Sequence, residues 1–109
     1  MTDTELSEAW ARMMGWHTVS IGLSWFDEAN NFVRRVRDWN PITSWSDWGL
    51  CYEWMEEQGY ALEIFEHKWP KYKVSCCWRK PERFGSSVST NLRRAMLLAA
   101  LKAEGVLEE

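Results

Sequence analysis

A histidine and a cysteine come closest to a catalytic pair in this sequence. A cysteine nucleophile needs a nearby histidine, or a helix N-terminus, to lower its pKa. His67 and Cys77 lie on the two sides of a predicted hairpin turn, so a cross-strand contact between them is geometrically possible. A small apolar cysteine and a surface histidine explain the same residues more simply. We therefore expect no catalytic residue, and predict that the chain is not an enzyme.

Motifs for metal, phosphate and cofactor binding are absent from the sequence. Cys51, Cys76 and Cys77 are odd in number, and no Cys-x-x-Cys occurs. This spacing fits neither a zinc site nor a disulfide framework. The sequence also has no H-E-x-x-H and no glycine-rich phosphate loop. We predict no metal site and no cofactor, and a reduced, intracellular protein.

Tryptophans beside basic residues give the clearest binding signal. The chain has 9 Trp in 109 residues, which is more indole than a core of this size can hide, and exposed aromatic rings tend to mark interfaces. An indole next to a cation can hold a nucleobase and its phosphate, and Trp and Arg also dominate the hot spots of protein interfaces. The predicted binding residues are Trp69, Lys68 and Lys71 at a hairpin tip, Trp39 with Arg35 and Arg37, and Arg79 with Arg83.

An alternative places Trp39 and Trp78 in the core with their neighbouring cations solvated, and we weigh it equally. Trp69 is harder to bury, because it lies at a turn between Lys68 and Lys71. The glutamates between residues 53 and 66 are interpreted as a solvated face rather than as a mimic of nucleic acid.

Size and charge restrict the class of protein. A chain of 109 residues fits one domain, here residues 1–109. The net charge of −3 argues against direct nucleic-acid binding. No apolar run approaches the roughly 18 residues that span a bilayer, and the first residues carry acids rather than a basic leader.

The hydrophobic periodicity predicts an α+β fold with the order α-β-β-α-β-β-α. Thr2 and Glu5 form a capping-box pattern, and Gly15 follows the first helix. The strands form two hairpins, which predicts a four-stranded, mostly antiparallel sheet with three helices. Residues 80–87 are predicted as a polar loop, and residues 106–109 as a frayed tail. The predicted helices are residues 3–14, 45–58 and 89–104, and the predicted strands are residues 17–25, 32–38, 60–67 and 72–79.

Three short motifs occur in this order of elements: Met13-Met14-Gly15-Trp16, Trp39-Asn40-Pro41-Ile42-Thr43 and Ala99-Ala100-Leu101-Lys102-Ala103. Together they resemble the phage ABA sandwich domain, a family of short bacteriophage and prophage proteins, over nearly the whole chain. In that family a Ser-Thr pair usually follows the proline directly, whereas Ile42 intervenes here. The resemblance implies a phage origin and helices on both sheet faces. The alternation in residues 72–79 instead indicates one face in contact with water. The family has no assigned activity, so no functional residue is carried over.

The resemblance and the surplus of tryptophan suggest a small phage-encoded, non-enzymatic binding protein. The leading hypothesis is an anti-defence inhibitor that binds a host defence protein stoichiometrically in the host cytoplasm. One alternative is a sponge that sequesters a nucleotide-type immune signal in a pocket lined by Trp and Arg, with a homodimer as one possible assembly. Another is a structural or regulatory phage protein with no role against host defence.

Overall fold

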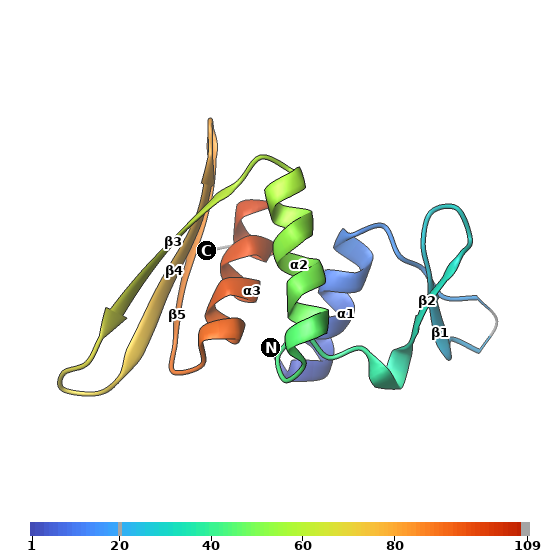
Figure 1. The fold of residues 1–109 in the computed structure, drawn as a ribbon, viewed down its shortest axis with the longest axis horizontal. Helices are drawn as coiled ribbons and strands as arrows, with labels where there is room; N and C mark the ends of the chain where they lie inside the picture. Colours follow the sequence, from blue (N-terminus) through green and yellow to red (C-terminus); the bar gives the residue numbers. More distant parts are fainter. Residues whose placement is uncertain (20, 108–109) are drawn as a thin grey trace.

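The computed structural model describes residues 1–19 and 21–107. It is an elongated α+β molecule of 47 × 30 × 24 Å with three helices and two antiparallel sheets (Figure 1). One sheet is the hairpin β1-β2, and the other is the meander β3-β4-β5. The elements are α1 (Asp3–Met13), β1 (Ser24–Phe26), β2 (Phe32–Arg35), a 3₁₀ turn (Val36–Asp38), α2 (Trp45–Glu57), β3 (Ala61–His67), β4 (Lys73–Lys80), β5 (Arg83–Ser89) and α3 (Leu92–Ala103).

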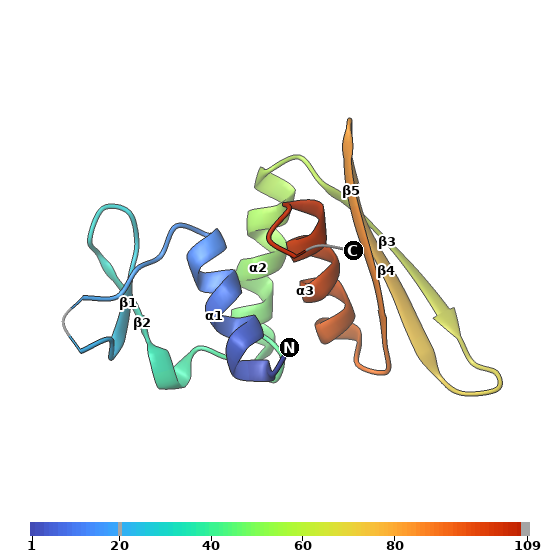
Figure 2. The same ribbon diagram turned by 180° about the vertical axis from the view of Figure 1, so that it is seen from behind.

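Helix α3 lies at the centre of the molecule. The three-stranded sheet packs on one side of it, and α1 and α2 pack on the other (Figures 1 and 2). Its buried residues therefore lie around most of its circumference, as expected for a helix that is covered on two sides. These residues are Ala95, Met96, Leu97, Ala99, Ala100, Leu101 and Ala103.

Strand β5 approaches α3 unusually closely. A Cβ atom built on Gly85 would lie 2.2 Å from the backbone nitrogen of Ala103 and 2.3 Å from the carbonyl oxygen of Ala99. The two backbones can meet only because Gly85 has no side chain and the facing helix residues are alanines. This contact fixes the distance between the sheet and the helix layer.

Buried tryptophans tie the layers together through their indole N–H groups. Trp10 of α1 donates to the carbonyl of Leu97 at 3.0 Å, and Trp78 of β4 donates to the carbonyl of Met96 at 2.9 Å. Both acceptors belong to α3, so the helix is anchored from each side. Each large apolar ring is thus buried with its one polar atom hydrogen-bonded, which avoids the cost of an unpaired buried donor.

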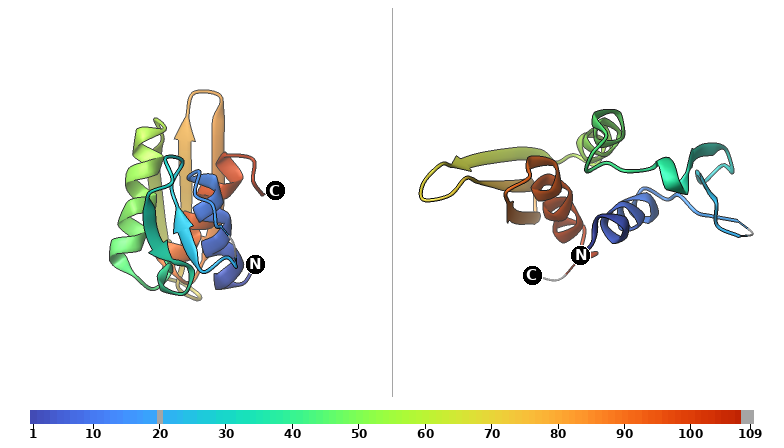
Figure 3. Two further views of the ribbon diagram at one scale, coloured as in Figure 1. Left: turned by 90° about the vertical axis from the view of Figure 1, so that its right-hand side faces the viewer. Right: turned by 90° about the horizontal axis from the view of Figure 1, so that it is seen from below.

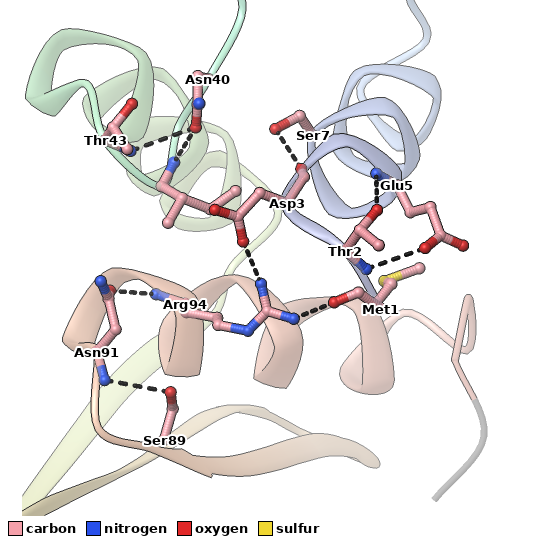
Figure 4. A network of polar contacts seen from close by, with 11 residues as sticks. Met1, Thr2, Asp3, Glu5, Ser7, Asn40, Thr43, Ser89, Asn91 and Arg94 are labelled. Atoms are coloured by element: carbon pink, nitrogen blue, oxygen red, sulfur yellow. Dashed lines mark hydrogen bonds and ion pairs between the residues drawn. The ribbon is translucent and has the colours of Figure 1, made fainter.

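The N-termini of α1 and α3 are joined by a polar network (Figure 4). The predicted capping box is confirmed: the Thr2 hydroxyl accepts from the Glu5 N–H at 3.1 Å, and the Glu5 carboxylate accepts from the Thr2 N–H at 3.0 Å. Arg94 of α3 donates to the carboxylate of Asp3 and to the carbonyl of Met1. This cation holds the first turn of α1 against α3.

The α+β class with three helices is confirmed, but the single four-stranded sheet is wrong, because the two hairpins form separate sheets. The predicted strand at residues 17–25 is also wrong over most of its length, and its Ser20 lies outside the described residues. Only Ser24 and Trp25 of that segment belong to β1, and His17 makes an isolated bridge to Phe26. The alternating apolar residues are exposed instead of buried: Val19, Ile21 and Leu23.

Two further boundaries differ from expectation. The strand predicted over residues 32–38 ends at Arg35, and residues 36–38 form the 3₁₀ turn. The predicted polar loop at residues 80–87 is wrong, because most of it is strand β5. The inward side chains of β5 are small, since α3 presses on Gly85 and Ser87, so this strand carries no apolar alternation to detect. In the predicted tail, the N–H groups of Val106 and Leu107 donate to the carbonyl of Leu101, and residues 108–109 lie outside the described part.

The close approach of β5 and α3 gives a stability prediction. Gly85→Ala forces the two backbones apart and should lower the free energy of unfolding by about 1–3 kcal/mol, the usual cost of overpacking. The matched control is Gly49→Ala in α2, where a Cβ meets nothing within 4 Å. That change should raise the free energy of unfolding by about 0.5–1 kcal/mol through helix propensity. Urea denaturation measures both, and equal effects of the two substitutions would contradict the packing described here.

Candidate functional site

One face of the β3-β4-β5 sheet is turned away from α3 and is covered by no other described element (Figure 3). Side chains alternate along a strand, and Val74, Cys76 and Trp78 are the buried, helix-facing residues of β4. The register then assigns the opposite set to what we call the open face. It consists of Ala61, Glu63, Phe65 and His67 on β3, Lys73, Ser75, Cys77 and Arg79 on β4, and Phe84, Ser86 and Val88 on β5.

Large apolar side chains of the open face are exposed to solvent. Phe65 is 58% exposed, Phe84 61% and Val88 58%. Phe65 and Val88 both flank Ser75 in one cross-strand row, and Phe84 flanks Arg79 in another. Exposed apolar groups that share one rigid surface are typical of an interaction site.

The β3-β4 hairpin extends the open face with a tryptophan at its tip. Trp69 is 87% exposed, which confirms the expectation that an indole between Lys68 and Lys71 stays outside the core. Tyr72, the residue before β4, is 46% exposed. The tip therefore presents two aromatic rings between lysine side chains, next to the open face.

The predicted binding residues do not form one site. Trp69, Lys68, Lys71 and Arg79 belong to the hairpin tip and open face. Arg83 follows the β4-β5 turn, where its guanidinium pairs with the Glu104 carboxylate at 2.9 Å.

The remaining predicted residues, Trp39, Arg35 and Arg37, lie near the β1-β2 hairpin at the other end of the molecule (Figure 1). The alternative that places Trp39 and Trp78 in the core is confirmed, because they are 4% and 2% exposed, and the expectation of an exposed Trp39 is wrong. The Trp39 indole donates to the Ser7 carbonyl at 2.7 Å, and its ring packs edge-on against Trp16 at 4.8 Å. Arg35 and Arg37 are exposed.

A cavity of about 420 Å³ lies between α1 and the segment that carries β1 and the 3₁₀ turn. Trp25 and Trp39 line it together with Arg12 and Arg37. The Arg12 guanidinium lies 5.3 Å from the Trp25 ring centre, and it also pairs with Glu8 at 3.1 Å. Asp3 and Glu8 line the cavity too, so its charges are balanced. We call this the Trp25 pocket.

Trp25 carries an unpaired polar atom. Its indole nitrogen is buried and has no hydrogen-bond partner among the described residues. Leaving a buried donor unpaired costs about 1–3 kcal/mol, and Arg12 stacked on the ring offsets part of that cost. The polar groups of the pocket are therefore less completely hydrogen-bonded than those of the core around α3.

The contact that the sequence allowed between His67 and Cys77 does not form. Cys77 lies opposite Glu63, and His67 lies opposite Lys73. The two residues are four positions apart along the ladder, which is roughly 13 Å at the usual rise per residue. The His67 Nε2 atom instead lies 3.1 Å from the Ser75 hydroxyl.

The other two cysteines are buried thiols. Burial raises the pKa of Cys76 to about 11. Burial, reinforced by the nearby Asp47 carboxylate, raises the pKa of Cys51 well above its ordinary value. Both therefore stay protonated at neutral pH, whereas the reactive form of a cysteine is the thiolate.

Within residues 1–19 and 21–107, His, Cys, Asp and Glu side chains do not gather in groups of three that could hold a metal ion. No helix in the described part combines the length and apolar character needed to cross a bilayer.

The sequence did not identify the apolar residues of the open face or the pocket residues Trp25 and Arg12. The alternation of β4 was the available signal for the face, since it placed Cys77 and Arg79 outward. Phe84 and Val88 required the recognition of β5. The pocket joins segments that lie far apart in sequence, so no local pattern marks it.

No match to this chain was found among protein-family models, curated proteins or solved structures.

The burial of the cysteines predicts their order of reaction. Cys77 is half-buried on the open face, whereas Cys51 and Cys76 are 2% and 1% exposed. In the folded protein, iodoacetamide should label Cys77 first, and all three thiols should react in denaturant. Peptide mass spectrometry locates the label. Rapid labelling of Cys51 or Cys76 in the folded state would contradict the packing of α2 and β4 described here.

Proposed function

We propose that this chain is a non-enzymatic binding protein that buries the open face and the hairpin tip against a protein partner. One observation carries the proposal: the sheet has a helix on one face only, the other face exposes Phe65, Phe84 and Val88, and the hairpin tip exposes Trp69. Full burial of such side chains is worth about 1.5–3 kcal/mol each. A partner that covers the face gains this energy without first reorganising the sheet.

The charges around this surface indicate the chemistry of the partner. Positive side chains lie at the two ends of the open face: Lys68, Lys71 and Lys73 near the hairpin tip, and Arg79 beside Phe84, with Glu63 in a row between them. The complementary surface is therefore one that combines apolar groups with acidic groups opposite the two ends. Charged rims mainly increase the rate of association, so binding should slow as ionic strength rises.

The resemblance to short phage proteins supplies a biological setting for the proposal. A phage-encoded binder of this kind would act in the host cytoplasm as a stoichiometric inhibitor of a defence protein. The exposed Trp69 supports a binding role, because tryptophan is enriched among interface hot spots. A structural or regulatory phage protein could use the same surface, and the identity of the captured partner separates the two roles.

The hot-spot proposal is tested by removing one indole at a time. Trp69→Ala should weaken binding of the partner captured from the host by about 30-fold or more, the effect of losing a hot spot of about 2 kcal/mol. Trp45→Ala is the matched control, because Trp45 is also exposed, at 61%, but lies at the start of α2. Isothermal titration measures the affinity and the stoichiometry. Equal losses in the two variants, or turnover of the partner, would refute the proposal.

The second candidate function is sequestration of a nucleotide-type signal in the Trp25 pocket. The lining by Trp25, Trp39, Arg12 and Arg37 favours it, because indole and guanidinium groups together can hold a base and a phosphate. The two indole rings are only 2% and 4% exposed, which leaves little ring surface for a base to stack on. The balanced charge of the pocket weakens the attraction for a highly charged ligand. We therefore rank this function below protein binding.

The pocket function has an inexpensive test. A nucleotide that binds there should change the tryptophan fluorescence, and Arg37→Ala should weaken its binding by about tenfold, or 1.4 kcal/mol. Arg79→Ala serves as the control because Arg79 lies on the open face. A flat fluorescence response across a panel of mononucleotides and cyclic dinucleotides would eliminate this function.

A further inference from the structure

Strand β3 extends beyond the helix layer. Helix α3 packs on β4 and β5, and β3 pairs only with β4. Ile64 points to the helix side by register, yet it is 46% exposed, while Phe65 on the open face is 58% exposed. Leu62 is half-buried, and the other six residues of β3 are exposed. This strand therefore presents both faces and its outer backbone edge to solvent.

The edge of β3 carries only part of the usual protection against pairing with another chain. Natural edge strands carry prolines, charged side chains or bulges. Ala61–His67 has two acids, Glu63 and Glu66, but it contains neither Pro nor Lys, and it pairs with β4 in a continuous register without a bulge. The other edge strand, β5, differs because α3 packs closely along it and its Arg83 is paired with Glu104.

We propose that a second copy of this chain adds to β3 in antiparallel orientation, so that two three-stranded sheets become one six-stranded sheet. A symmetric dimer uses the same surface of both copies, and an antiparallel β3 pair satisfies this condition. Strand addition to a free edge provides backbone hydrogen bonds, and the side chains then select the register.

The charges of β3 select one register. A twofold axis at Glu63 or at Glu66 places like charges directly opposite each other, which is destabilising. An axis at Ile64 places neither glutamate opposite the histidine. An axis at Phe65 pairs the two Phe65 rings and places each Glu63 carboxylate opposite the partner copy's histidine at position 67. In this register the two Glu66 side chains of the dimer are diagonal neighbours. Their repulsion is weaker than that of a directly opposed pair because their separation is larger.

The dimer would enlarge the binding surface, but dimerisation itself would not depend on partner binding. The two open faces become continuous across the Phe65 pair, and each hairpin tip with Trp69 approaches the Ala61–Arg79 row of the other copy. Strand addition alone buries less than the roughly 1,200 Å² of a standard stable interface. The expected dimer therefore forms reversibly at micromolar concentrations. It does not require the proposed function, because pairing uses the strand edge and partner binding uses the face.

Analytical ultracentrifugation of the whole chain across the micromolar range tests the register by charge exchange. His67→Glu should raise the dimer dissociation constant by about tenfold, because it opposes two carboxylates. Glu63→Lys should raise it as well, because it removes the carboxylate that faces the histidine of the second copy. The double variant places a lysine opposite a glutamate and should restore dimerisation. Circular dichroism and urea denaturation check that every variant is folded. Both residues are exposed, and His67 gives up only its contact with the Ser75 hydroxyl.

Ser86→Lys is the matched control, because Ser86 lies on the same face of the other edge strand and should leave the dimer unchanged. Three results would overturn the inference: a monomer at the highest concentration, single variants that dimerise like the native chain, or a folded double variant that stays monomeric. Loss of the dimer with Ser86→Lys would also overturn it, since the contact would then lie on β5 or across the open faces. Partner binding by a strictly monomeric chain would leave the proposed function intact.

Discussion

The burial of α3 is the constraint on which the rest of this structure depends. Its alanines and leucines are apolar around most of the helix, so water must be excluded from two sides. The sheet covers one side, with Gly85 against Ala103, and α1 and α2 cover the other. All three helices are thus used within one layered core. The outer face of the sheet is left uncovered, and the surface proposed to bind is a consequence of this arrangement.

The β1-β2 end of the molecule is held differently, mainly through one buried carboxylate. Asp47 of α2 is 3% exposed and accepts from the Arg34 guanidinium at 2.9 Å and from the Asn40 N–H at 3.0 Å. Asp47 is buried while the Arg34 side chain is 37% exposed, so removing either the Arg34 guanidinium or the Asn40 N–H leaves a buried carboxylate with fewer partners. The fully exposed pairs contribute little. This end therefore depends on a few specific polar contacts, and the end near the sheet depends on close packing.

The sequence predicted the elements whose signals are local. The capping box of Thr2 and Glu5 and the glycine after each helix marked the helices to within a few residues, and the Lys68–Lys71 turn placed Trp69 at an exposed tip. Strand β5 was not predicted because its inward residues are small. Their small size is explained only by the close contact with α3. The alternation of residues 17–25 misled because a period of two shows that a strand is possible without supplying a partner strand. Trp39 and the apolar open face depended on contacts between distant segments.

The central claim is that the open face is accessible in the free protein and becomes covered when the protein acts. Hydroxyl-radical footprinting with mass spectrometry tests it on the dilute chain and on its complex with a captured partner. The account predicts strong labelling of Phe84, Val88 and Trp69 in the free chain, loss of that labelling in the complex, and little labelling of Trp10 and Trp78 in either. Unlabelled Phe84 and Trp69 in the free chain, or undiminished labelling in the complex, would contradict it.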